Sequence, residues 1–245
     1  MSMNRREFLR LSGASVLGLT GLVGLALPDW AHATPGSARP VLRCEPSAHR
    51  VVAVWPGGRE VVLGRLGTGP GEFNFPCAAA VDAAGRLHVL DRGNGRVQVL
   101  DAAGACLASF PVAPGARDLD LDDAGQVAVA DAFGGFRLYR DGQEVATARG
   151  LGRLTGVVWT AAGWHALDAA GRRVVVLDRG ARPVREVALA ATGVPCALAA
   201  SPDGQVAVLD GATGVVQRLD GATLAALPAG TRRMAHEGGA WRARA

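Results

Sequence analysis

Four similar segments recur along the chain, and each ends a short apolar strand with an aspartate after a glycine-containing turn. The aspartates are Asp91, Asp131, Asp168 and Asp210, so the repeats are spaced by 40, 37 and 42 residues. This period is typical of one β-propeller blade. The apolar runs around each aspartate predict four short strands with turns between them and no long helical period. We therefore expect an all-β fold, a β-propeller of four-stranded blades around a channel.

The first 33 residues have the features of an export signal. Residues 4–10 (Asn-Arg-Arg-Glu-Phe-Leu-Arg) resemble the twin-arginine motif, an apolar stretch follows at 11–27, and Ala-His-Ala at 31–33 offers a small-residue cleavage site. The alternative is a membrane anchor, because the 17 residues of 11–27 are near the lower limit for crossing a bilayer. We predict cleavage, a periplasmic or secreted protein, and no membrane span after cleavage. The residues that the export machinery would read are Arg5, Arg6, Phe8 and Leu9.

The remaining 212 residues (245 − 33) are expected to form a leader at 34–48 and one propeller at 49–245. Strands are predicted upstream of the repeats at 49–55 and 60–64, and downstream at 232–236 and 241–245. Pairing of these strands into one composite blade would close the ring and hide its edge strands. Five blades are favoured, since 212/5 gives about 42 residues per blade, whereas the alternative of six gives about 35, shorter than any repeat spacing.

One repeat resembles the NHL repeat nearly throughout. It begins with Gly-Thr-Gly-Pro-Gly-Glu-Phe-Asn-Phe-Pro at 67–76. The matching positions that follow are Val81, Asp82, Gly85, Val89, Asp91, Gly93, Asn94, Arg96, Val97, Gln98, Val99 and Gly104. The resemblance implies a propeller, commonly of six blades. NHL proteins include protein-binding and RNA-binding scaffolds, and a zinc-dependent amidating lyase shares the architecture, so the resemblance does not fix a function.

Few residues are arranged for catalysis. A catalytic zinc needs about three converging protein ligands, but the histidines left after cleavage are dispersed: His49, His88, His165 and His236. No Gly-x-Ser-x-Gly turn is present. We expect no cofactor, no metal and no catalytic residue. The alternative is a hydrolase or lyase with a metal-dependent site at the channel mouth, where three carboxylates alternate on one strand face; they are Asp118, Asp120 and Asp122.

The cysteines show no metal, redox or haem motif, because no Cys-x-x-Cys occurs. Export would permit disulfides. A Cys77–Cys196 bridge would have to cross part of the channel mouth, while Cys44 with Cys106 is conceivable because their blades adjoin. Free buried thiols are the expectation.

The loops that enter the innermost strands, and those after the repeated aspartates, are rich in arginine. All 26 basic residues of the chain are arginine, and the formal net charge is +4, too small an excess to indicate nucleic-acid binding. One interpretation is scattered solvated charge; the other is a docking surface for an acidic protein, peptide or glycan. Because RNA is an improbable partner for an exported protein, we favour a non-catalytic protein- or ligand-binding module, an accessory subunit or scaffold. The acids in these loops are Glu72 and Asp118, and the expected binding residues are Arg92, Arg117, Arg149, Arg153, Arg172, Arg232, Arg233, Phe73, Phe75 and Phe133.

Overall fold

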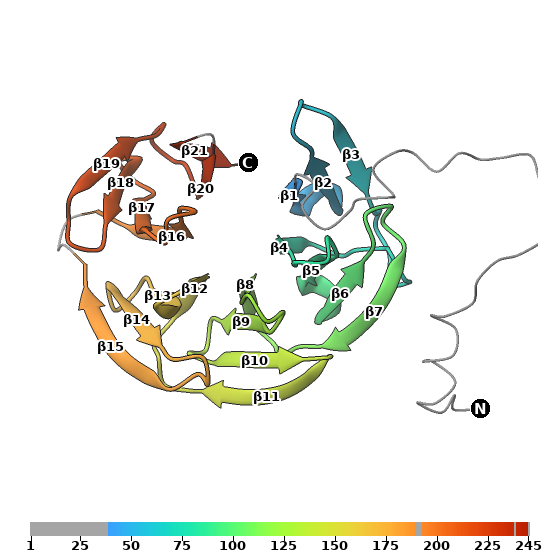
Figure 1. Cartoon of the computed structure of the whole chain (residues 1–245), viewed down its shortest axis with the longest axis horizontal. Coiled ribbons are helices and arrows are strands. Elements are labelled where there is room, and N and C mark those ends of the chain that lie inside the picture. Colours follow the sequence, from blue (N-terminus) through green and yellow to red (C-terminus); the bar gives the residue numbers. More distant parts are fainter. Residues whose placement is uncertain (1–38, 190–192, 238, 245) are drawn as a thin grey trace, which may run out of the picture. The chain divides into compact units, whose positions relative to one another are not determined.

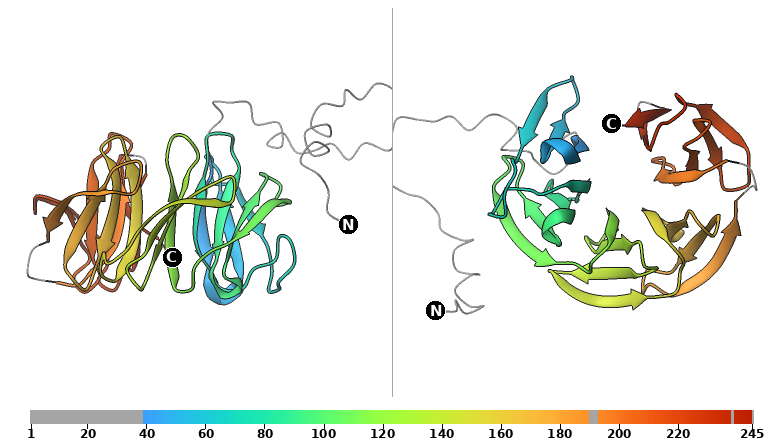
Figure 2. Two further views of the ribbon diagram at one scale, coloured as in Figure 1. Left: turned by 90° about the horizontal axis from the view of Figure 1, so that it is seen from below. Right: turned by 180° about the vertical axis from the view of Figure 1, so that it is seen from behind.

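The computed structural model describes residues 39–189, 193–237 and 239–244. They belong to one compact unit, Ala33–Ala245, in which small antiparallel sheets are arranged around a central channel (Figures 1 and 2). The export signal lies outside the described residues. In the described part of the chain, no helix has the length and apolar character needed to cross a bilayer.

Four sheets are complete four-stranded blades, in which the strands follow one another in sequence order from the channel outward. This confirms the predicted all-β propeller of four-stranded blades. The blades are β4 (Pro76–Val81), β5 (Leu87–Asp91), β6 (Arg96–Leu100) and β7 (Cys106–Pro111); β8 (Ala116–Leu121), β9 (Val127–Asp131), β10 (Phe136–Arg140) and β11 (Gln143–Ala148); β12 (Leu154–Thr160), β13 (Gly163–Asp168), β14 (Arg173–Leu177) and β15 (Pro183–Ala188); β16 (Pro195–Ala200), β17 (Val206–Asp210), β18 (Val215–Arg218) and β19 (Thr223–Ala226).

Where the composite blade was expected, strands from the two ends of the chain form two sheets, which lie on either side of an opening in the ring (Figure 1). One sheet is β1-β2-β3 and the other is β20-β21, and no ladder joins the two among the described residues. In the predicted composite blade, 241–245 (β21) would be the second strand and 49–55 (β2) the third, so β21 would pair with β2. Instead β1 pairs with that edge of β2, from Val41↔Val54 to Glu45↔Arg50. The bounds are β1 (Val41–Glu45), β2 (Arg50–Val54), β3 (Glu60–Leu63), β20 (Arg233–Glu237) and β21 (Ala240–Arg244).

Strand β1 falls within the segment expected to be a leader, 34–48. It is followed by the short 3-10 helix η2 (Pro46–Ala48) and by His49, whose φ of 53° is left-handed. The same path occurs in the first complete blade, where η3 (Arg92–Asn94) and Gly95, with φ 64°, join β5 to β6. Glycine adopts this conformation without a steric penalty. Because the equivalent position of the first sheet is histidine instead of glycine, the repeat cannot be recognised there from the sequence.

The hydrophobic core lies between the blades. Every residue of β5, β9 and β13, the second strands of three blades, is buried. These strands are covered on both faces by neighbouring sheets, so most of their residues are apolar on both faces, apart from His88, His165 and the terminal aspartates. The outermost strands β7, β11 and β15 are mostly exposed.

The repeated aspartates stabilise the turns that follow the second strands. Asp131 Oδ1 accepts hydrogen bonds from the backbone N–H groups of Phe133 and Gly135, and Asp168 Oδ1 accepts one from Gly171 N–H. Each is also paired with an arginine of the third strand, Arg137 or Arg173. Since these carboxylates are buried and satisfied locally, they are structural.

Candidate functional site

The central channel forms a cavity of about 1420 Å³. Its wall comes from β1 and from the first strand of every later sheet, namely β4, β8, β12, β16 and β20. Neighbouring first strands run in the same direction, because residues at matching positions contact each other. The backbone N–H groups of Val157 and Trp159 in β12 donate to Asp118 and Asp120 of β8, and Cys77 and Cys196 at strand starts contact Arg117 and Thr231. The starting ends of the first strands therefore gather at one mouth of the channel and their final ends at the other.

Four exposed arginines surround the mouth at which the first strands begin. All four line the cavity, and none forms an ion pair within the part of the chain that the structure describes. We call this set the arginine mouth: Arg92, Arg117, Arg153 and Arg232. The opposite mouth is lined by carboxylates, Asp82, Asp122 and Asp123. These carboxylates are paired with Arg86 and Arg179, so the unpaired charge around the openings of the channel lies at the arginine mouth.

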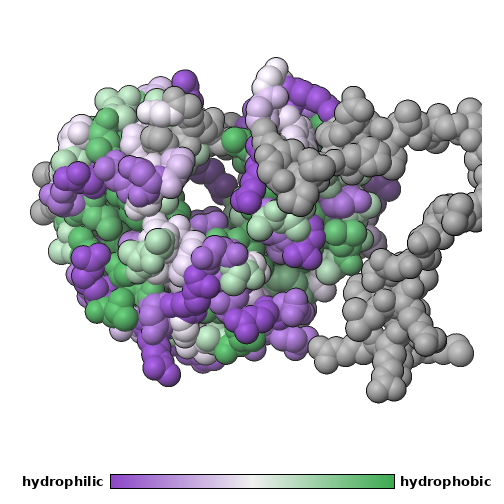
Figure 3. All heavy atoms as spheres, in the orientation of Figure 1, coloured by the Kyte–Doolittle hydropathy of each residue, from purple (hydrophilic) through white to green (hydrophobic). Residues whose placement is uncertain are grey.

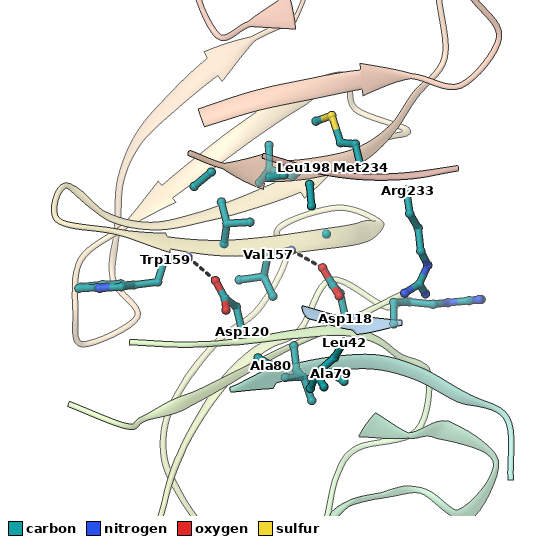
Figure 4. Close-up of a pocket in the computed structure, with 18 of the residues that line it drawn as sticks. Leu42, Ala79, Ala80, Asp118, Asp120, Val157, Trp159, Leu198, Arg233 and Met234 are labelled. Atoms are coloured by element: carbon teal, nitrogen blue, oxygen red, sulfur yellow. Dashed lines mark hydrogen bonds between the residues drawn. The ribbon is translucent and has the colours of Figure 1, made fainter. Parts of the chain in front are cut away.

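The other arginines of the predicted face lie apart from this set. Arg233 is half-buried, points into the channel (Figure 4), and donates a hydrogen bond to the carbonyl oxygen of Cys77. Arg172 is half-buried, donates to the carbonyl oxygen of Gly193, and lines a separate cavity of about 260 Å³. Arg149 is exposed but does not line the channel.

The three predicted aromatic residues differ in exposure. The expectation that Phe73 is a surface contact is wrong, because its side chain is 0% exposed and belongs to the core with Val51, Leu63 and Leu87. Its loop turns inward, since Phe73 N–H donates to the carbonyl of Arg65 at 2.8 Å. The remaining two aromatics, Phe75 and Phe133, are 43% and 79% exposed.

Two carboxyl groups lie deep in the channel, on the same face of β8 (Figure 4). Asp118 Oδ2 accepts a hydrogen bond from Val157 N–H at 2.9 Å, and Asp120 Oδ2 accepts one from Trp159 N–H at 2.8 Å. They thus join β8 to the innermost strand of the next blade. Burial raises the pKa of Asp118 to about 6 and that of Asp120 to about 7, because the channel wall solvates the charged form poorly.

The third alternating carboxylate, Asp122, has a different role. It accepts hydrogen bonds from Ala124 N–H and Gln126 N–H at the turn after β8. The three aspartates proposed as metal ligands therefore bind backbone groups at separate places. Within the described ranges, no three side chains of histidine, cysteine, aspartate or glutamate come together as a metal site.

The histidines and cysteines are also used in packing. His88 and His165 are buried in the second strands of their blades, and burial lowers the pKa of both. All four cysteines are free, Cys44 and Cys106 included. Cys44 and Cys77 are buried, whereas Cys106 and Cys196 are half-buried instead of buried as expected. Burial raises the pKa of Cys44 and Cys77 to about 12, so these thiols are poor nucleophiles. His49 Nδ1 accepts a hydrogen bond from Phe75 N–H at 3.2 Å, and the side chain of His236 lies outside the described part.

Comparison with known proteins supports the NHL resemblance over a short segment. No family model matches the chain. Over 38 residues, 16% of the chain, it is 55% identical to NHL repeat-containing protein 3 of Homo sapiens and to the same protein of Mus musculus. That segment spans 11% of the length of these relatives.

Solved structures share the fold. A streptogramin B lyase structure superposes with a TM-score of 0.64 at 10% identity, covering 82% of this chain and 71% of that one. A catalytically inactive virginiamycin B lyase from Staphylococcus aureus with quinupristin gives 0.62 at 10% identity, covering 76% of this chain and 64% of the lyase. A protein of unknown function from Bacteroides caccae gives 0.54 at 14% identity, covering 74% and 69%. At these identities the likeness concerns the propeller fold alone.

Proposed function

We propose that this propeller is an exported, non-catalytic binding module that docks an acidic partner through the arginine mouth. The observation that carries the proposal is the difference between these arginines and others in the chain. Arg65, Arg86 and Arg96 are each paired with a carboxylate of the propeller. The four arginines of the mouth converge on one cavity and have no carboxylate partner in the described residues.

Electrostatics makes such a mouth a docking surface for acids. Unpaired like charges around one opening raise the local positive potential, and they attract and orient an acidic partner. Guanidinium groups bind carboxylates in a bidentate manner, and they shed their hydration more easily than ammonium groups. The carboxylates of the opposite mouth are paired with arginines, so the unpaired positive charge is at the arginine mouth and binding is expected at that end of the channel.

Charge reversal at the mouth is expected to abolish this docking. A variant with Arg117→Glu, Arg153→Glu and Arg232→Glu should bind a fluorescent polyglutamate peptide on the order of 100-fold more weakly at low salt, because like charges facing each other cost several kcal/mol. Fluorescence anisotropy measures the affinity. Binding by the unmodified protein should also weaken towards 1 M salt, where the Debye length is roughly 3 Å.

The matched control reverses three exposed arginines that do not line the channel, with Arg140→Glu, Arg182→Glu and Arg185→Glu. Its net charge equals that of the mouth variant, so it should keep most of the affinity. If both variants lose the peptide equally, net charge alone explains the binding and the proposal fails.

Export is tested on the signal itself. Changing Arg5 and Arg6 to glutamine should leave the precursor in the cytoplasm, whereas Arg39→Gln should not affect export. Cell fractionation and N-terminal sequencing report the result. A mature protein that begins near Thr34 in the double variant would contradict twin-arginine export.

A further inference from the structure

The first sheet lacks a strand at its innermost position. Strand β1 leads through η2 to β2 in the same way as β5 leads through η3 to β6, and Glu45↔Arg50 is the counterpart of Asp91↔Arg96. Strand β1 is therefore equivalent to the second strand of a complete blade. In the first complete blade the second strand also pairs with an innermost strand, since β4 pairs with β5. The edge of β1 that faces away from β2 has no such partner among the described residues.

The unoccupied strand position is part of the channel cavity. On one side the cavity is lined by Val41–Cys44 of β1 and by the adjacent β4. On the other side it is lined by residues 232–235, which include the start of β20. Figure 1 shows the opening of the ring between the β1-β2-β3 sheet and the β20-β21 sheet, and Figure 3 shows a hollow in the molecular surface there. The walls are small or apolar side chains, including Leu42, Ala79 and Met234 (Figure 4).

Charge surrounds the entrance to this position. Arg92, Arg117 and Arg232 lie at the mouth, and Arg233 lies inside it, near enough to Cys44 and Asp118 to affect the pKa of both groups. An open strand edge beside a positively charged entrance suits an extended chain that carries acidic residues, because main-chain hydrogen bonds supply affinity and the charges supply selection.

We infer that the free edge of β1 binds an extended acidic segment of the partner, which adds to the first sheet as its missing innermost strand. This inference rests on the proposed function and names the form in which the partner binds. The first strands β4, β8, β12 and β16 all start at the arginine mouth and are antiparallel to the second strands. The added segment therefore enters with its N-terminal end at the arginines and runs inward, antiparallel to β1.

This direction sets the sequence of the segment. Its first residues are acidic and face the arginine mouth, and the next five or so, matched to the length of β1, are small or apolar. A second copy of this chain fits less well, because the chain is itself positively charged, with a net charge of +4 over the full sequence. Residues 34–38 of the chain itself (Thr-Pro-Gly-Ser-Ala) contain no acid, and their proline and glycine disfavour a strand.

The test uses a fluorescent peptide of three glutamates followed by the sequence of Pro76–Val81 with alanine in place of the cysteine. Two further peptides carry the same charges and are N-methylated on every second backbone N–H group of the apolar part. One has the methyl groups on the first, third and fifth of the N–H groups that follow the proline, and the other on the second and fourth. In an added strand, successive amides point to opposite sides. We expect one methylated peptide to bind at least tenfold more weakly than the unmodified peptide, and the other to bind nearly as well.

Hydrogen exchange locates the contact. The unmodified peptide should slow amide exchange within Val41–Glu45, while the outer strand β3 should not change. Equal binding of all three peptides, with no protection in β1, overturns strand addition. That result leaves the proposed function intact, because the charge-reversal variants decide it separately.

The chain's own leader is tested as a competing occupant. In a variant whose residues 34–38 are replaced by a glycine-serine stretch, the peptide should bind with unchanged affinity. If only this variant binds the peptide, the leader fills the strand position and the inference is wrong. A stable dimer in sedimentation that excludes the peptide would overturn it in favour of a second copy.

Discussion

Replacing Asp120 by asparagine is expected to raise the free energy of unfolding at pH 8, and the gain should shrink as the pH falls towards 4. The pKa of Asp120 is about 7 in the folded protein, against a usual value of 3.8. Between these values the folded state holds a proton that the unfolded state has released, so stability falls as the pH rises through this window. A shift of about 3 units corresponds to at most about 4 kcal/mol. Asparagine keeps an oxygen for Trp159 N–H but never ionises.

Denaturant unfolding at several pH values from 5 to 8 measures this effect as the difference between the variant and the unmodified protein. Taking this difference cancels the contributions of the other titrating groups, because both proteins contain them. Asp123→Asn is the control, because Asp123 is an exposed carboxylate three residues further along that pairs with Arg179. Its difference should stay within about 0.5 kcal/mol at every pH. A constant difference for Asp120→Asn would show that the carboxyl group is ionised throughout the range.

The blades could be predicted from the sequence because each is specified locally. The repeated aspartates mark the turns after the second strands, and the hydrogen bonds of Asp131 and Asp168 are made within a few residues. Because each blade needs such an aspartate close to its own turn, the aspartates recur once per blade along the sequence, and counting them gives the number of complete blades. The NHL resemblance adds no information on the chain ends, where the repeat is least regular.

The chain ends could not be predicted because their pairing depends on competition between distant strands. Strands β1 and β21 are both candidates for the same edge of β2, and the structure has β1 there. The sequence signal for β1 was weak, since His49 replaces the glycine found in the next blade. Burial of Phe73 was missed because its loop is polar and glycine-rich, whereas the ring packs in the core against residues far from it in the sequence, such as Val51 and Leu87.

The candidate site was predicted in outline. The repeat placed the arginines in loops at one end of the propeller, and five of the seven line the channel. Which of these arginines line the channel depends on how far each loop reaches inward. The spacing of the repeats along the sequence does not predict that. Thus Arg233 enters the channel, whereas Arg149 remains outside it. The alternation of Asp118 and Asp120 was visible in the sequence, but their partners are backbone groups of another blade.

Asp91→Ala is expected to cause the largest loss of stability of any single change proposed for this protein. The carboxylate of Asp91 is 0% exposed and accepts hydrogen bonds from Asn74 N–H at 2.7 Å, Asn94 Nδ2 at 2.8 Å and Arg96 Nε at 2.9 Å. Alanine would leave these donors, including a largely buried guanidinium, without an acceptor. Removing one member of a buried ion pair costs about 3–5 kcal/mol.

The matched change is Asp101→Ala, at the next hairpin of the same blade. Asp101 also accepts backbone hydrogen bonds, from Ala103 and Ala105 N–H, but in an exposed turn. Its loss should cost about 1 kcal/mol, since water can replace the carboxylate. Chemical denaturation compares the two. Hydrogen exchange should also quicken at Gly69, because Arg96 contacts the carbonyls of Gly69 and Glu72 and holds their loop in place. Equal losses for the two variants would mean that Asp91 is only a turn residue and that the loop entering β4 is held by its own packing.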